Sequence, residues 1–178
     1  MNKGETAMDH DAVKRARDVR LVCSDFDGIF TDAMVYTDEN GVESVRCSRR
    51  DSLGINMLKR AGISMHVISK ETNPVVATRC KKMGVEYDQA VESGEGKAEI
   101  MTRVAKSAGL NVSQVAFIGD DVNDIPALKI AGFAVTVADG HPLVKQVAHY
   151  TTAARGGEHA IRELCEYILT AQGHPINY

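Results

Sequence analysis

The chain has 178 residues, of which 44% are hydrophobic and 25% charged, the usual mixture for one globular domain with its own core. Its formal net charge of −3 provides no basic surface for nucleic acid or for an anionic membrane. No apolar run approaches the roughly 18 to 20 residues that a membrane-spanning helix needs, so neither nucleic acid nor a membrane is an expected partner.

The chain start and the cysteines indicate the compartment. Residues 1–18 are polar and lack the apolar segment of a signal peptide, so we expect a leader that is a frayed tail or an irregular surface helix. The cysteines are widely spaced, without any C-x-x-C pair, which favours free thiols in a reducing cytosol over disulfides or a zinc site. We therefore expect a cytoplasmic protein. The cysteines are Cys23, Cys47, Cys80 and Cys165.

The first strong structural signal lies in residues 19–32, where a short apolar run ends in Asp25, Asp27 and Gly28. Such a run, bounded by turn residues, favours a buried parallel strand. Ligands of open parallel sheets bind beyond the carboxyl ends of the strands, which is where both aspartates fall. Two acids at i and i+2 of an extended chain point the same way, and their repulsion is relieved by a proton or a cation. Hard oxygen ligands of this kind suit Mg²⁺.

Residues 33–48 are predicted to form a β-hairpin. Two partly alternating apolar runs flank Asn40-Gly41, and Asn-Gly is a strong hairpin signal because both residues tolerate positive φ. The hairpin is an excursion from the main sheet, so its apolar face needs a partner, for which another subunit is the natural candidate.

The rest of the chain alternates strands with helices of about ten residues, which is typical of βαβ units. We therefore predict an α/β fold, a Rossmann-like doubly wound parallel sheet, in a single domain over residues 19–172 with a loose tail at 173–178. Strands are expected at 63–68, 85–87, 115–118, 133–138 and 150–152, and helices at 52–61, 74–83, 97–108, 125–131, 142–149 and 156–172.

Four positions that can carry chemistry fall near strand ends or helix starts. They are the pair Asp25 and Asp27, then Ser69, then Lys97, and finally the acidic group Asp120, Asp121 and Asp124. Each has an ordinary structural explanation; the last group, for example, could cap a helix N-terminus. Their joint occurrence in this order favours a site for phosphoryl transfer.

The predicted chemistry passes through an aspartyl phosphate. Asp25 is the expected nucleophile, and Asp27 the acid that protonates the leaving group and later the base that activates water. Mg²⁺ held by Asp25, the main-chain carbonyl of Asp27 and Asp120 would shield the phosphate charge. Ser69 and Lys97 are expected to bind phosphate, with Asp121 in support and Asp124 as a further ligand or an orienting partner for Lys97.

The segments DFDGIFTD and GDDVND, together with Ser69 and Lys97, resemble the four motifs of the haloacid dehalogenase superfamily. The likeness extends over residues 19–172. More narrowly, the chain resembles the capless branch of 3-deoxy-D-manno-octulosonate 8-phosphate phosphatases, nononate 9-phosphate phosphatases and the phosphatase-like domain of acylneuraminate cytidylyltransferases. The resemblance implies Mg²⁺ dependence, no cap domain, and a homotetramer whose hairpins pack together while a neighbouring subunit closes the site.

The resemblance also implies the substrate class, the terminal phosphate of a 3-deoxy-2-ulosonic acid. Octulosonate phosphatases carry Thr-Gly-Arg where this chain has Ser69-Lys70-Glu71, and the nononate relatives resemble it in having Glu, so the particular acid sugar stays open. Lys70, Glu71, Arg49 and Arg155 are candidate substrate contacts.

Two other functions fit parts of the pattern. A catalytically silent oligomerisation or regulatory module would keep the fold, although it has no physical need for both Asp25 and Asp27. A two-component receiver domain also has a doubly wound sheet, an acidic pocket and a lysine, but its phosphorylated aspartate normally ends the third strand.

Overall fold

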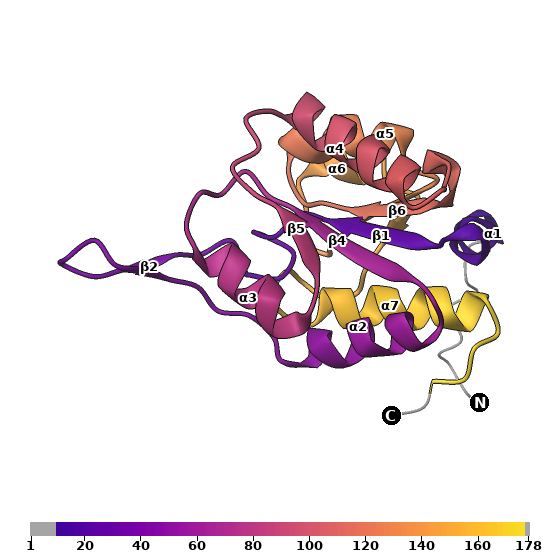
Figure 1. Ribbon diagram of the computed structural model, residues 1–178, viewed down its shortest axis with the longest axis horizontal. Helices are drawn as coiled ribbons and strands as arrows, with labels where there is room; N and C mark the ends of the chain where they lie inside the picture. The colour runs from indigo at the N-terminus through magenta and orange to yellow at the C-terminus, as the bar shows by residue number, and fades with distance from the viewer. Residues whose placement is uncertain (1–9, 177–178) are drawn as a thin grey trace.

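The computed structural model describes residues 10–176, so the first nine residues of the expected leader and the last two of the expected tail lie outside the described residues. Within them, six parallel strands form one sheet in the order β5-β4-β1-β6-β7-β8 (Figure 1). The predicted doubly wound sheet is confirmed. The strands are β1 (Leu21–Ser24), β4 (Ser64–Ile68), β5 (Glu86–Asp88), β6 (Val115–Ile118), β7 (Phe133–Thr136) and β8 (Tyr150–Thr151).

The strand order places a binding site beside β1. The chain adds β4 and β5 on one side of β1, then returns to add β6, β7 and β8 on the other. The crevice at the carboxyl ends of strands where the order reverses is the usual ligand site of such sheets. Asp25 follows β1 and Asp120 follows β6, so both acids border this crevice.

Helices cover both faces of the sheet (Figure 1). Side chains alternate along β1, so that Val22 faces one core and Leu21 and Cys23 face the other. The first core is covered by α2 (Arg50–Arg60), α3 (Val75–Met83) and α7 (Ala160–Ala171), the second by α4 (Gly94–Ser107), α5 (Ile125–Ile130) and α6 (Pro142–Lys145). Two short 3₁₀ helices, η1 (Val112–Gln114) and η2 (Val122–Asp124), precede β6 and α5. None of the helices in residues 10–176 has the length and apolar character needed to cross a membrane.

The expected polar leader requires a correction, because part of it is a helix that belongs to the core. Helix α1 (His10–Asp18) buries Ala12 and Ala16 completely, and both join the hydrophobic cluster that contains α7. Arg17 Nε also donates to the carbonyl of Ala171, 3.2 Å away, at the end of α7. The fully buried residues are two alanines four residues apart among charged neighbours, so this helix lacks the large apolar side chains that usually mark a core-facing helix.

The predicted hairpin is present as β2 (Tyr36–Thr37) paired antiparallel with β3 (Glu43–Ser44), and it projects away from the body of the protein (Figure 1). Only Gly41 has positive φ in its turn, at 75°, and its N–H donates to the carbonyl of Asp38 over 3.0 Å. The turn is therefore a three-residue loop with glycine in the left-handed region, in place of positive φ at both Asn40 and Gly41.

The other predicted elements differ from the structure mainly at their ends. Helix α4 begins three residues before Lys97, since the side chain of Ser93 caps it by accepting from the N–H of Gly96. The helix expected at 142–149 ends at Lys145. All four cysteines are free thiols, as expected.

Candidate active site

Asp25 lies at the carboxyl end of β1 and is held there by the backbone. Its N–H donates to the carbonyl of Ile118, 3.0 Å away, which ties this residue to the end of β6. Its Oδ1 accepts from the N–H of Phe26 over 2.7 Å, and the residue is 7% exposed. The carboxylate is therefore fixed at the edge of the crevice with a little of its surface open.

Lys97 forms the centre of the charge network. Its side chain is completely buried, and Nζ lies 2.6 Å from Oδ2 of Asp25 and 2.6 Å from Oδ1 of Asp124. Burial acts to lower the pKa of Lys97, but the two carboxylates outweigh it and the pKa is raised above its ordinary value. A buried ammonium of this kind stays charged because both of its neighbours are anions.

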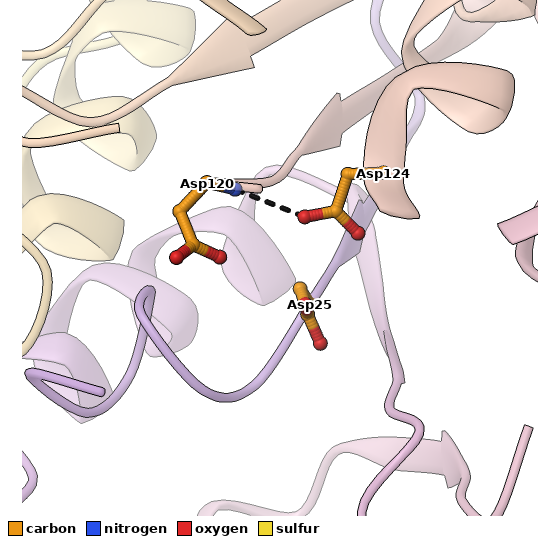
Figure 2. A group of neighbouring side chains, drawn as sticks. All are labelled: Asp25, Asp120 and Asp124. Carbon is orange, nitrogen blue, oxygen red and sulfur yellow. Dashed lines mark hydrogen bonds between the residues drawn. The ribbon is translucent and has the colours of Figure 1, made fainter. Parts of the chain in front are cut away.

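Asp124 organises the turn after β6. Its Oδ2 accepts from the N–H of Asp120 over 3.0 Å (Figure 2). The same oxygen accepts from the N–H of Asp121 over 3.3 Å, while Oδ1 binds Lys97. Asp121 in turn caps η2, because its Oδ1 accepts from the N–H of Val122 over 2.7 Å. Both oxygens of Asp124 are thus engaged within the protein, which favours orientation of Lys97 as its role.

The acidic groups come close enough to share one cation. Asp25, Asp120 and Asp124 each offer a carboxylate oxygen, and these oxygens all lie within 4.8 Å of one another (Figure 2). Gly28 makes this approach possible, because a Cβ at its φ of +73° would overlap the carboxylate of Asp120.

The electrostatics of this group fit a divalent metal. Burial, followed by the charges of Asp124 and Asp121, raises the pKa of Asp120 to about 7. Burial and the charge of Asp124 also raise the pKa of Asp25, although Lys97 opposes them. Buried carboxylates that repel one another are stabilised by a bound cation, and hard oxygen donors suit an ion such as Mg²⁺. Asp124 is completely buried, whereas Asp25 and Asp120 keep some exposed surface, so Asp25 and Asp120 are the side chains better placed to hold the ion.

Asp27 lies on the turn that follows Asp25. Its Oδ1 accepts from the hydroxyl of Thr31 over 3.1 Å, and that hydroxyl oxygen also accepts from the N–H groups of Gly28 and Ala33. Burial is the main reason that the pKa of Asp27 is raised, and the charge of Glu71 adds to it. A half-buried carboxyl with a raised pKa is suited to holding and releasing a proton. The sequence reasoning missed Thr31, for which the only signal was its place four residues after Asp27.

Ser69, Lys70 and Glu71 follow β4 along the same edge of the sheet. Ser69 is buried and its Oγ accepts from the N–H of Glu71 over 3.0 Å. Glu71 Oε1 accepts from two backbone N–H groups before α3, at 2.7 and 2.8 Å, and Lys70 is exposed. The effect of Glu71 on the pKa of Asp27 places its charge beside the acidic site.

The candidate arginines are placed differently. Arg49 is exposed ahead of α2, and Arg155 Nε donates to Oδ2 of Asp139 over 3.2 Å. Asp51, two residues after Arg49, is completely buried and its Oδ1 accepts from the N–H of Arg162 in α7. Asp51 therefore caps α7 and takes no part in the site. Of the predicted residues, the structure brings together in one cluster Asp25, Lys97, Asp120 and Asp124.

A comparison with protein-family models identifies the chain. The model of haloacid dehalogenase-like hydrolases matches residues 61–161, more than half of its length. The chain belongs to the haloacid dehalogenase-like hydrolases. The curated relatives include the 3-deoxy-D-manno-octulosonate 8-phosphate phosphatase of Yersinia pestis, 33% identical over 162 residues that cover 91% of this chain and 86% of the relative. The enzyme of the same name from Escherichia coli K12 is 31% identical and is covered to the same 86%.

Solved structures agree with the sequence relatives. A hypothetical protein from Xanthomonas campestris superposes with a TM-score of 0.90 at 34% identity, covering 97% of this chain and 94% of that one. The 3-deoxy-D-manno-octulosonate 8-phosphate phosphatase of Moraxella catarrhalis, in complex with magnesium, phosphate and KDO, gives 0.86 at 32% identity and covers 92% of each chain. The resemblance to the octulosonate phosphatase branch is confirmed, and the protein is by class a phosphomonoester hydrolase.

Proposed function

We propose that this hydrolase is a Mg²⁺-dependent phosphatase that removes the terminal phosphate of a 3-deoxy-2-ulosonic acid through a phosphorylated Asp25. The single observation that carries this proposal is the buried Lys97, bonded to both Asp25 and Asp124 beside Asp120. A carboxylate held against a fixed cation at the open end of a strand is equipped to attack a phosphate dianion.

The residues divide the chemistry among themselves. An Asp25 oxygen forms a bond to phosphorus as the bond from phosphorus to the sugar oxygen breaks, and the Asp27 carboxyl gives its proton to that oxygen. Asp27 then takes a proton from the water that cleaves the aspartyl phosphate, which restores both residues. Lys97 opposes the rise in the pKa of Asp25 and offsets the negative charge throughout, and Ser69 contributes a hydroxyl. Mg²⁺, when held by Asp25, Asp120 and the carbonyl of Asp27, would shield the repulsion between carboxylate and phosphate.

Two substrates of this class are candidates. The names of the relatives from Yersinia, Escherichia and Moraxella favour octulosonate 8-phosphate. Glu71 favours a nononate 9-phosphate, because the nononate relatives carry Glu at this position, where octulosonate phosphatases carry Arg. Lys70, Arg49 and Arg155 are proposed contacts for the rest of the sugar, and the four free thiols support a cytoplasmic setting.

We also propose that the protein works as a homotetramer joined through the hairpin. Met34, Val35, Tyr36 and Val42 on the hairpin are each at least half exposed. A two-stranded hairpin that stands away from the body is marginal alone, and its apolar side chains favour burial against copies of itself. A neighbouring subunit would also cover the crevice, which a chain without a cap domain leaves open to water.

A side-by-side kinetic comparison tests the function. Octulosonate 8-phosphate and the nononate 9-phosphates should be hydrolysed with Mg²⁺ and not after its removal with EDTA, and Asp25→Asn should abolish turnover. Lys106→Met, an exposed substitution on the same helix as Lys97, is the control and should behave as the wild type. If wild type and Asp25→Asn were equally inert towards all these substrates and p-nitrophenyl phosphate, the silent module would be the better description.

A further inference from the structure

The turn formed by residues 26–31, which carries Asp27, is enclosed on two sides. On one side Gly28 lies against the carboxylate of Asp120, close enough that no Cβ fits between them. On the other side lies the segment of residues 153–157, which leads from β8 towards α7.

The second contact is a backbone-to-backbone approach. A Cβ on Gly156 would overlap the carbonyl group of Gly28 and would lie 3.0 Å from the carbonyl oxygen of Thr31. The N–H of the next residue, Gly157, donates to the carbonyl of Ile29 over 3.0 Å. The segment therefore lies directly against the backbone of the turn, and only a residue without a side chain fits at position 156.

Hydrogen bonds anchor the segment to the turn before α6 and to the first turn of α7. Oδ1 of Asp139 accepts from the N–H of Gly156 over 3.0 Å. Glu163, in the first turn of α7, accepts from the N–H groups of Ala153 and Ala154, at 2.8 Å each. Because both of its ends are anchored, the segment can hold the turn of residues 26–31 in place.

The turn's own backbone bonds meet at Phe26 and not at Asp27. The N–H groups of Ile29, Phe30 and Thr31 all donate to the carbonyl of Phe26, at 3.4, 2.8 and 3.3 Å. The Asp27 carboxylate is fixed by the hydroxyl of Thr31 alone among the hydrogen bonds described above, so the position of Asp27 depends on what lies against the turn. The turn also leads straight into the exposed hairpin, whose movements would otherwise reach Asp27.

We propose that residues 153–157 are a positioning brace, in which Gly156 holds the backbone of Gly28 and thereby sets where the Asp27 carboxyl meets the leaving group. The proposal rests on the function proposed above, since it gives the brace its catalytic consequence. Gly156 touches neither substrate nor metal and acts only through the turn. A shift of about 1 Å in such a group is enough to cost on the order of 10²-fold in rate.

The test compares two alanine substitutions. Gly156→Ala pushes against the turn. Gly132→Ala, directly before β7, makes an equally severe overlap with the carbonyl of Ser113 in η1, at the opposite end of the strands from the site. Hydrolysis of p-nitrophenyl phosphate, thermal unfolding and hydrogen exchange of a peptide covering residues 26–32 are measured for both. We expect Gly156→Ala to lower kcat on the order of 10²-fold with a smaller change in KM, and to speed exchange in the peptide. Gly132→Ala should lower only the unfolding temperature.

A second variant and the exchange measurement distinguish loss of the brace from general destabilisation and from failure of the proposed function. Asp139→Ala removes the anchor without adding bulk, so it should speed exchange in the same peptide and lower kcat several-fold, and it decides the matter if Gly156→Ala does not fold. Unchanged exchange of residues 26–32 in the folded variants, or a kcat equal to that of Gly132→Ala, would overturn the brace. If the wild type itself hydrolyses nothing, the proposed function fails, and the exchange data alone decide whether the brace exists.

Discussion

Replacing Lys97 with methionine removes the one cation that the two buried carboxylates share. Nζ lies 2.6 Å from both Asp25 and Asp124, and the side chains of Lys97 and Asp124 are completely buried. Methionine keeps most of the length and apolar volume of the lysine stem, so the change isolates the charge. The two carboxylates are then left facing each other without compensation.

The expected cost follows from that arrangement. Breaking a buried ion pair by removing one partner costs about 3–5 kcal/mol in the free energy of unfolding. For a chain of this size that corresponds to a fall of roughly 6–20 °C in Tm, at about 2–4 °C per kcal/mol. Turnover should fall on the order of 10²- to 10³-fold, as for the loss of one electrostatic contact in a catalytic site.

The loss should depend on pH in a defined direction. Burial and Asp124 already raise the pKa of Asp25, and removing Lys97, which opposes them, raises it further. A carboxyl whose folded pKa lies above its unfolded value loses stability as pH rises through that interval. The wild type already carries a pKa of about 8 at Asp25, so the deficit of Lys97→Met relative to wild type should be nearly constant at lower pH and grow as pH rises above about 8.

Urea unfolding in EDTA at pH 6, 8 and 9.5 measures this deficit, with Lys106→Met, exposed on the same helix, as the control. Adding Asp124→Asn to Lys97→Met should recover part of the stability, because it removes one of the two facing charges. A deficit that stays the same at all three pH values, or equals that of the control, would refute the charge network as described.

The remaining predictions concern separate parts of the molecule. Burial raises the pKa of Asp51 to about 6, so the wild type should lose stability as pH rises from 4 to 6 while Asp51→Asn should not. The unfolding free energy of Asp51→Asn should therefore gain about 1.4 kcal/mol per pH unit relative to wild type, and an equal pH dependence of both proteins in urea unfolding would contradict this. Asp120→Ala should bind Mg²⁺ weakly by calorimetry, and wild-type affinity should fall as pH drops below about 7, where a proton occupies Asp120; pH-independent binding would remove it as a ligand. Asp27→Asn should keep Mg²⁺ binding but turn over slowly, and full activity would end its acid–base role. Tyr36→Asp, at a site 63% exposed, should reduce the sedimenting mass, and a monomeric wild type would refute the hairpin interface.

Much of the fold can be predicted from local sequence patterns. Short apolar runs alternate with helices that begin at Pro74 or Ser93 and end at glycines such as Gly84, and these signals act over a few residues. Asp25 and Asp27 follow their strand directly, so the rule that ligands bind at the carboxyl ends of parallel strands already indicated the site. The hairpin at Asn40-Gly41 was predicted on the same local basis, although its turn type was not.

The tertiary structure alone decided which side chains meet. Lys97 by itself resembles any exposed lysine at a helix start, and it becomes a buried bridge only because the packing of α4 brings it to Asp25, 72 residues earlier in the sequence. Asp51 caps α7 across 111 residues, Arg155 binds Asp139, and two alanines of α1 complete the core. Such partners depend on the register in which strands and helices pack, which is the sum of many weak contacts along the whole chain, whereas a turn or a strand end is determined by its immediate neighbours.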